Sequence, residues 1–256
     1  MSDSVGLAAH RYMALVAPAL DRVVRAAMQA GQDGGGAELS QRYGGVPATS
    51  FLVELRTRLA APGGFVDGAG FAAITRYRDP IACQRALDRH VAYGMSHRRP
   101  DGGLTATERG TAFLAELYQV HAEVTEELWA GHDDRVERLA DTAGRLLTAA
   151  LAPRGDEPVP GPGAFDAVAP PYEPDGTPSG VLLLNRLGTL RYHRADAHTD
   201  AWTAAGHTPA SIVELTDGTQ WRAIEQETDR RAAGPYTALT AEQRLLFLAD
   251  LAALPG

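Results

Sequence analysis

The sequence predicts a mainly α-helical fold, and three observations support this prediction. Apolar residues recur at intervals of three and four along most of the chain, the spacing that places them on one face of a helix. Glycine- or proline-containing segments separate these stretches, as expected between helices. Eight of the sixteen prolines fall within residues 153–179, which predicts a linker between an N-terminal domain, residues 1–152, and a helical C-terminal domain, residues 180–256.

The N-terminal domain is expected to begin with three helices. Residues 8–30 carry apolar side chains at helical spacing, and Pro18 falls inside this stretch, where a proline is expected to kink the helix. Residues 31–36, with the sequence GQDGGG, predict a flexible break. Two shorter helices are expected over residues 37–43 and 48–61.

The next block contains the clearest succession of helix and turn patterns. Asp79 followed by Pro80 is a favourable helix start, because aspartate caps the first turn and proline at the first helical position lacks only an N–H that would be unpaired there. Gly94 is a natural end for this helix. The expected elements are a helix at 68–77, a helix at 79–93, a polar turn at 97–103, a strand at 104–105 and a long helix at 108–130. A helix pair, a strand–turn–strand and a further helix, in this order, are typical of a winged helix-turn-helix.

The run Leu104 to Gly110, LTATERG, resembles the wing of MarR-type regulators. In that family a leucine–threonine pair followed by a glycine marks the second wing strand and the start of the dimerisation helix. The resemblance covers only about residues 67–130, and similar motifs occur in winged helices that do not bind DNA. It implies a ligand-responsive transcriptional regulator that binds duplex DNA. MarR-type proteins usually lack a separate C-terminal domain, so the resemblance leaves that part of the chain unexplained.

The resemblance also implies which residues would contact DNA. The helix over residues 79–93 would enter the major groove, where glutamine and arginine side chains match adenine and guanine edges. The turn that follows would contact phosphates. The implied contact residues are Gln84, Arg85, Arg89, Arg98 and Arg99. The net charge of −8 argues against general nucleic-acid affinity, although residues 76–99 hold six arginines and two aspartates. The alternative is that these arginines solvate an exposed helix face.

The two long helices expected at 108–130 and 133–151 have two interpretations. In the winged-helix class such helices commonly form a homodimer interface, which would place it within residues 108–151. The alternative is that their apolar stripes pack in the core. His121 lies on the stripe of the first of these helices, and it is either a core residue or part of a ligand pocket, as in MarR-like dimers.

The C-terminal domain is expected to contain helices at 181–190, 195–205, 211–215, 221–233 and 241–254. A short internal similarity links the two halves of the chain. The sequence LTATER at residues 104–109 resembles LTAEQR at residues 239–244. This similarity suggests a second winged-helix-like unit, with chance as the competing explanation in so alanine-rich a chain.

The densest group of reactive side chains is the run RYHRADAHTDAW at residues 191–202. An imidazole with nearby carboxylates can act as a general base, because a carboxylate orients the ring and raises its basicity. The candidate acid–base residues are His193, Asp196, His198 and Asp200, and Tyr192 and Trp202 are candidates for ligand contact. This group favours an alternative function, an enzyme of small-molecule or antibiotic biosynthesis. A simpler interpretation of this group is a structural hydrogen-bond network. A third interpretation of the whole chain is a non-catalytic partner subunit that uses the long helices as an interface.

A second polar run, residues 225–231, places Glu225 and Asp229 one helical turn apart. It is typical of a solvated, ion-paired helix face. If this helix packs against residues 191–202, its carboxylates complete the acid–base group.

Several absences narrow the function further. The chain has no glycine-rich nucleotide-binding motif, so no cofactor is expected. Its histidines and single cysteine, Cys83, match no standard zinc signature, so no zinc site is expected, although the histidines and aspartates of residues 191–202 could equally hold an oxygen-preferring metal ion. The sequence contains no run of 18 apolar residues, so no membrane span is predicted. A single cysteine suits a reducing compartment, which favours the cytoplasm. All 24 basic residues are arginine, which suggests a GC-rich genome such as that of an actinobacterium.

Overall fold

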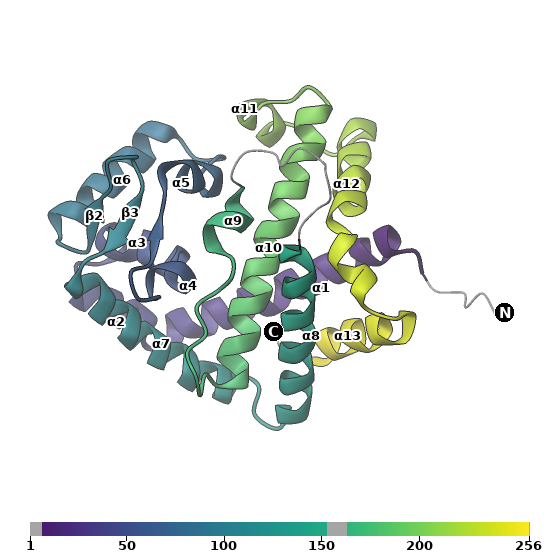
Figure 1. The fold of residues 1–256 in the computed structure, drawn as a ribbon, viewed down its shortest axis with the longest axis horizontal. Coiled ribbons are helices and arrows are strands. Elements are labelled where there is room, and N and C mark those ends of the chain that lie inside the picture. The colour runs from purple at the N-terminus through teal and green to yellow at the C-terminus, as the bar shows by residue number, and fades with distance from the viewer. Residues whose placement is uncertain (1–6, 153–162, 256) are drawn as a thin grey trace.

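The computed structural model describes residues 7–152 and 163–255, and it confirms a mainly helical protein with one small sheet (Figure 1). The helices of the first half are α1 (Ala9–Gly31), α2 (Ala37–Arg42), α3 (Val46–Glu54), α4 (Arg56–Leu59), α5 (Gly68–Ile74), α6 (Pro80–Ala92), α7 (Glu108–Leu128) and α8 (Asp133–Leu151). Those of the second half are α9 (Ala164–Val168), α10 (Ser179–Ala204), α11 (Pro209–Val213), α12 (Thr219–Ala232) and α13 (Ala241–Ala253), with a 3-10 turn, η2 (Gly234–Ala238). Among these described elements, no helix combines the length and apolar character needed to cross a bilayer.

The sheet lies in the first half of the chain and consists of three short antiparallel strands. They are β1 (Phe65–Val66), β2 (Ser96–Arg98) and β3 (Leu104–Ala106), arranged in the order β1-β3-β2. Strands β2 and β3 form a hairpin with His97 opposite Thr105. Strand β1, which no sequence pattern predicted, pairs with β3 from the other side.

The predicted helix starts around this sheet are confirmed. The Asp79 carboxylate accepts a hydrogen bond from the Ile81 N–H at 3.0 Å, at the start of α6. The Thr107 hydroxyl accepts one from the Gly110 N–H at 3.0 Å, at the start of α7. Such caps satisfy backbone donors that the first turn of a helix leaves unpaired. The local polar residues therefore set where the two longest helices of this unit begin.

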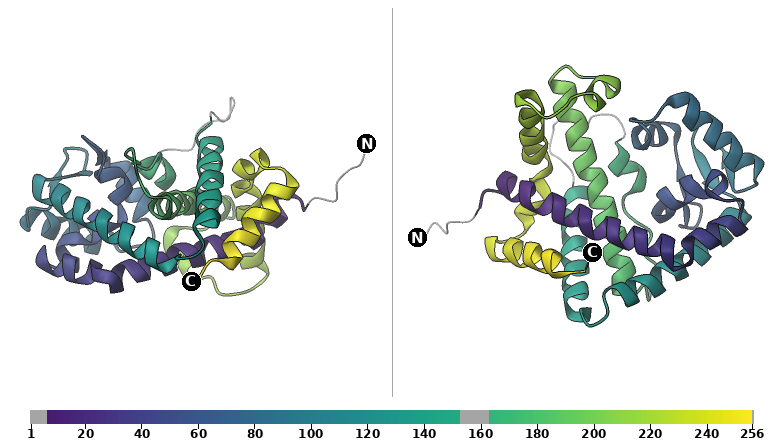
Figure 2. Two further views of the ribbon diagram at one scale, coloured as in Figure 1. Left: turned by 90° about the horizontal axis from the view of Figure 1, so that it is seen from below. Right: turned by 180° about the vertical axis from the view of Figure 1, so that it is seen from behind.

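Two large hydrophobic cores hold the described residues together, and a small third cluster consists of Ala201, Trp202, Ile212 and Ile224. One lies around the sheet and includes Leu52, Leu87 and Phe113, from α3, α6 and α7. The other joins α1, α8, α10, η2 and α13, and the right-hand view of Figure 2 shows α1 crossing in front of α10. The first helix therefore shares a core with the C-terminal helices, and the cores do not follow the predicted division into residues 1–152 and 180–256.

The glycine-rich segment after α1 forms a kink between two helices, at the place where a break was predicted. Within Gln32–Gly36, which joins α1 to α2, the backbone angles of Gly34 and Gly35 are not helical, and the positive φ of 112° at Gly35 favours glycine. A Cβ atom on Gly34 would lie 2.4 Å from Cγ1 of Val124, so glycine lets this segment pack closely against α7. The glycines thus serve a tight contact between helices.

Helix α10 is continuous over 26 residues, where two helices separated at residues 191–194 were predicted. Residues 191–194 contain neither glycine nor proline, so nothing in this stretch interrupts the helix. Helices α1, α7, α8, α9 and α12 surround α10, so its polar residues are enclosed by neighbouring helices. Of the predicted acid–base group, His193 is buried, and Asp196, His198 and Asp200 are half-buried.

The structure also bears on the predicted dimer interface and on the second winged-helix-like unit. The apolar stripes of α7 and α8 are buried against helices of the same chain, so the feature that suggested a homodimer is used within the protomer. In the second half, the repeated motif only caps α13: the Thr240 hydroxyl accepts a hydrogen bond from the Gln243 N–H at 3.2 Å. Since all strands found in the described ranges lie between residues 65 and 106, the C-terminal motif is not part of a hairpin.

The described part of the predicted linker, residues 163–179, packs against both cores. Phe165 belongs to the helical core, and Val168 belongs to the core around the sheet. Beyond α9, the Tyr172 N–H donates to the Thr57 carbonyl at 2.8 Å. This segment therefore lies between the two cores and contacts each; residues 153–162 of the predicted linker lie outside the described residues.

Candidate functional site

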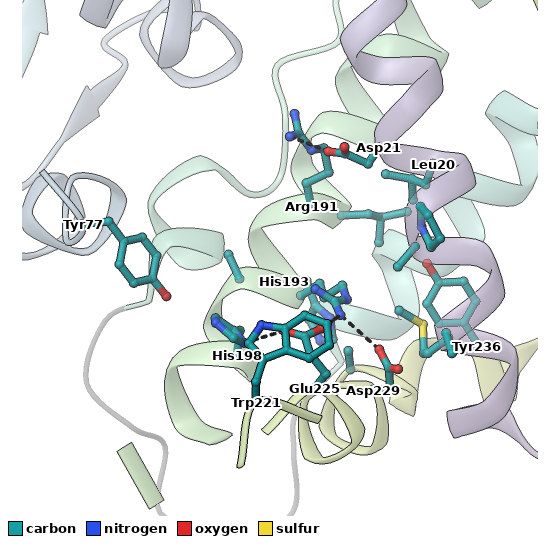
Figure 3. A pocket seen from close by; sticks show the side chains of 18 residues that line it. Leu20, Asp21, Tyr77, Arg191, His193, His198, Trp221, Glu225, Asp229 and Tyr236 are labelled. Carbon is teal, nitrogen blue, oxygen red and sulfur yellow. Dashed lines mark hydrogen bonds and ion pairs between the residues drawn. The ribbon is translucent and has the colours of Figure 1, made fainter. Parts of the chain in front are cut away.

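A cavity of about 620 Å³ lies between α1, α10 and α12 (Figure 3). Its apolar side comes from α1 and includes Met13 and Leu20. Its polar side comes from α10 and α12, and Trp221 and Tyr77 lie at its edge. A concave site with apolar walls and a few converging polar groups is typical of small-molecule binding.

Arg194 lies at the centre of the polar side. Its Nη2 atom is 2.8 Å from Glu225 Oε2 and 3.1 Å from Asp229 Oδ1. Burial lowers the pKa of Arg194, but the two carboxylates outweigh burial and hold this pKa above its ordinary value. Burial also raises the pKa of Asp229, with Arg194 acting in the opposite direction. The guanidinium therefore stays charged and fixes both acids of α12 against α10.

His198 faces the same carboxylate. Its Nδ1 atom lies 3.1 Å from the Thr228 hydroxyl oxygen and 3.5 Å from Glu225 Oε1. Because the Thr228 hydroxyl donates its hydrogen to the Ile224 carbonyl at 2.8 Å, we infer that Nδ1 carries the imidazole proton. Burial lowers the pKa of His198, Glu225 opposes this, and the arginines Arg194 and Arg76 add to it. The ring is thus oriented and neutral, with Nε2 as the proton acceptor, which is the form a general base needs.

The cavity brings together two of the four predicted acid–base residues. His193 lines it and packs edge-to-face on Phe165, with 5.3 Å between the ring centroids. Glu225 and Asp229 line the same cavity as His193 and His198. This is the arrangement expected if residues 225–231 pack against the helix that carries the histidines. Neither Asp196 nor Asp200 lines this cavity.

Asp196 instead holds neighbouring segments to α10. Its two oxygens accept the N–H groups of Ala164 and Phe165 at 3.0 and 2.8 Å, at the start of α9. Its Oδ1 atom also lies 2.5 Å from Arg76 Nη2, and the same guanidinium binds the Thr199 hydroxyl. An aspartate with this many partners is suited to positioning α9, which the sequence pattern alone did not indicate.

The three predicted ligand contacts lie apart from this cavity. Trp202 is buried, and its Nε1 donates to the Tyr77 hydroxyl at 3.0 Å, which links α10 to the unit around the sheet. Tyr192 and His121 line two other cavities. Burial raises the pKa of Tyr192 to about 12 and lowers that of His121 to about 3, so both side chains are neutral near pH 7.

The five predicted DNA contacts lie on α6 and the adjoining hairpin. Arg85 and Arg89 are exposed on α6. Gln84 and Arg98 both contact Asp88, at 3.3 and 2.7 Å, so strand β2 is joined to α6 by an exposed ion pair. Arg99 stacks over the Phe65 ring at 4.1 Å and lies 3.4 Å from Asp101. The structure therefore brings these side chains to one exposed region, with two of the four arginines already near carboxylates.

Metal binding gains no support in the parts of the chain that the structure describes, where no three His, Cys, Asp or Glu side chains group closely enough to hold an ion. Comparison of the chain with protein-family models, curated proteins and solved structures found no significant match. The function is therefore inferred from the geometry of the cavity and of the α6 surface.

Proposed function

We propose that the protein is a ligand-responsive transcriptional regulator of the winged-helix type. One observation carries this proposal: α5, α6 and the β2–β3 hairpin follow one another, with β1 completing the sheet in the order β1-β3-β2. This order supports the proposal because it is the order expected of a winged helix, in which α6 would be the recognition helix and the hairpin would be the wing. The exposed arginines of α6 and of the hairpin have the chemistry that DNA contact requires.

In this proposal α6 enters the major groove, and the hairpin follows the adjacent phosphates. Arg85 and Arg89 are one helical turn apart, so both reach the same groove. Arg98 leaves its ion pair with Asp88 to contact phosphate. The cost is small because the two side chains are 35% and 63% exposed, and exposed ion pairs contribute little. The cavity in Figure 3 supplies a small-molecule site on the same chain.

Fluorescence anisotropy with duplex DNA from upstream of the gene tests this proposal. We expect binding that weakens steeply with salt and falls by about tenfold or more in Arg85→Ala and Arg89→Ala. Arg230→Ala, at a 63% exposed arginine on α12, is the matched control and should bind like the wild type. Absence of a complex at low salt, or equal losses in all three variants, would refute the proposal.

The geometry of His198 favours a second candidate function, an enzyme of small-molecule biosynthesis. Thr228 and Glu225 orient its ring beside Arg194, in a cavity of about 620 Å³. In such an enzyme His198 Nε2 would remove a proton from the substrate, and Glu225 would stabilise the resulting imidazolium.

Metabolite profiling of strains that carry His198→Ala or His198→Asn tests this candidate. A product should disappear in both variants, while circular dichroism shows an intact fold. The asparagine variant separates the two roles of the ring, because it keeps a hydrogen-bond donor for Thr228 and lacks the proton acceptor. Unchanged metabolites in both strains would exclude His198 as the base.

A further inference from the structure

A second cavity, of about 410 Å³, lies where the two hydrophobic cores meet. It is bounded by α4, α7, α10 and the segment at residues 172–176, and we call it the junction cavity. Leu114, Leu117 and Val181 contribute apolar walls. The hydrogen bond from the Tyr172 N–H to the Thr57 carbonyl holds the segment over one side. The junction cavity shares no lining residue with the cavity in Figure 3, so it is a separate site.

Arg56, on the wall formed by α4, is a cation that lacks a compensating anion. Its Nη1 donates to the Val53 carbonyl at 3.1 Å, whereas its Nε is inaccessible and has no hydrogen-bond partner in the described residues. No ion pair between described residues includes it. Burial lowers its pKa to about 10, so it remains protonated near pH 7. The side chain is half-buried, and a cation partly withdrawn from water is unfavourable until an anion joins it.

Two further polar groups line the same cavity. Asn185 is 6% exposed, and its Oδ1 atom is buried without a partner among the described residues. His121 is 3% exposed, and burial together with the neighbouring Arg56 cation keeps its imidazole neutral. Gly31 packs against this ring, since a Cβ there would lie 3.1 Å from the imidazole Cδ2. The junction cavity therefore offers a guanidinium, an unpaired amide oxygen and a fixed neutral imidazole.

We propose that the junction cavity binds a small monocarboxylate with an apolar body. The guanidinium of Arg56 would pair with the carboxylate, and the leucine and valine side chains would contact the alkyl or aryl part. The charged side chains in the lining are Arg56 and Asp175. Asp175 repels any anion and repels a dianion such as phosphate more strongly, so a monocarboxylate fits this lining better than a dianion.

The other side of Arg56 is less suited to an anion. There it borders a cavity of about 550 Å³ that also contains Glu54, Arg78 and Arg191. Both of these neighbouring arginines already have carboxylate partners: Arg78 lies 2.7 Å from Glu54, and Arg191 lies 2.6 Å from Asp21. We therefore expect the carboxylate of the ligand to pair with Arg56 from the side of the junction cavity, which α7 lines.

Isothermal titration calorimetry of the full chain tests the proposal with 3-phenylpropanoate and octanoate, each compared with its neutral amide. At least one carboxylate should bind about tenfold or more tightly than its amide. Arg56→Met should abolish this preference. Arg58→Met is the matched control on the same short helix: its side chain stacks near Phe65, does not line the junction cavity, and should leave binding unchanged.

Thermal unfolding of the ligand-free proteins separates a binding role for Arg56 from a structural one. If the cation awaits an anion, Arg56→Met should unfold at a higher temperature than the wild type, because the variant has no unpaired, half-buried charge. The carboxylate should then stabilise the wild type alone. A lower unfolding temperature for Arg56→Met, equal binding of acid and amide, or binding that survives this substitution would overturn the proposal. None of these measurements involves DNA, so the site stands or fails separately from the proposed regulator.

Discussion

The two cavities use arginine in opposite ways. In the cavity of Figure 3, Arg194 contacts Glu225 and Asp229, and Arg191 contacts Asp21, so each cation has its anion within the protein. In the junction cavity, Arg56 has no carboxylate partner among the described residues. A compensated cation stabilises the fold, whereas an uncompensated one lowers stability and offers a site for an anion. The same residue type therefore has a structural role in one cavity and a recognition role in the other.

The largest expected effect is on the pH dependence of stability, and it comes from His121 in the junction cavity. The pKa of His121 is about 3 in the folded protein and near 6.5 when unfolded, so its stabilising contribution is complete above pH 6.5 and is lost as the pH falls. Between pH 6.5 and 4 the loss should be about 3 kcal/mol. Urea titrations of wild type and His121→Gln across this range measure it. His90, with a pKa of about 4, acts in the same direction in both proteins, so an identical pH slope in the two would contradict the prediction.

The next effect is expected at Asp196, on the helix that both cavities share. Asp196→Ala removes the acceptor for two backbone N–H groups of α9 and the partner of Arg76. We expect a loss of about 2–3 kcal/mol in the free energy of unfolding, since hydrogen bonds to a charged group are among the stronger ones. Asp217→Ala, at an 83% exposed aspartate, is the control and should change stability by less than about 0.5 kcal/mol. If Asp196→Ala lowered the free energy of unfolding as little as Asp217→Ala does, Asp196 would not hold α9 in place.

The smallest change in the free energy of unfolding is expected for a substitution at Arg194. The sign of this change is the sharpest test of whether the arginines of the two cavities differ in role. Arg194→Met leaves Glu225 and Asp229 without their cation and should destabilise the protein by about 2 kcal/mol, less than for a fully buried pair because the side chain is 30% exposed. Arg56→Met is expected to change stability in the opposite direction. Arg230→Met serves as the exposed control. Chemical denaturation of the three variants in parallel would disprove the comparison if Arg194→Met and Arg56→Met shifted stability in the same direction.

Elements that local residues define were predictable from the sequence. Asp79-Pro80 and Thr107 cap helices where the sequence placed them, because a cap depends on a few neighbouring backbone groups. Strand β1 was missed because two residues carry no alternating pattern, and its pairing with β3 is a long-range contact. The continuity of α10 was missed for a similar reason, since its polar residues are satisfied by distant parts of the chain, namely α12 and Arg76.

The candidate site was predictable only in part. His193 and His198 stood out by residue type, and the spacing of Glu225 and Asp229 indicated a way for these acids to join them. The partners of Asp196 come from α9 and from Arg76, just beyond α5, and no local pattern reveals them. Arg56 was not singled out either. In the sequence LRTRLA nothing distinguishes it from Arg58, because only the packing of α4 against α7 and α10 determines which arginine lines a cavity.

Helix α10 has a consequence for the two cavities together. It is about 39 Å long at 1.5 Å per residue. Asn185, in its first half, lines the junction cavity, and His198, near its other end, lines the cavity in Figure 3. A ligand in one cavity that displaces or stiffens this helix alters the affinity of the other cavity. Thermodynamic linkage requires the reverse effect to be equal, so a molecule bound beside Arg56 and one bound beside His198 would act as reciprocal effectors through a single shared wall.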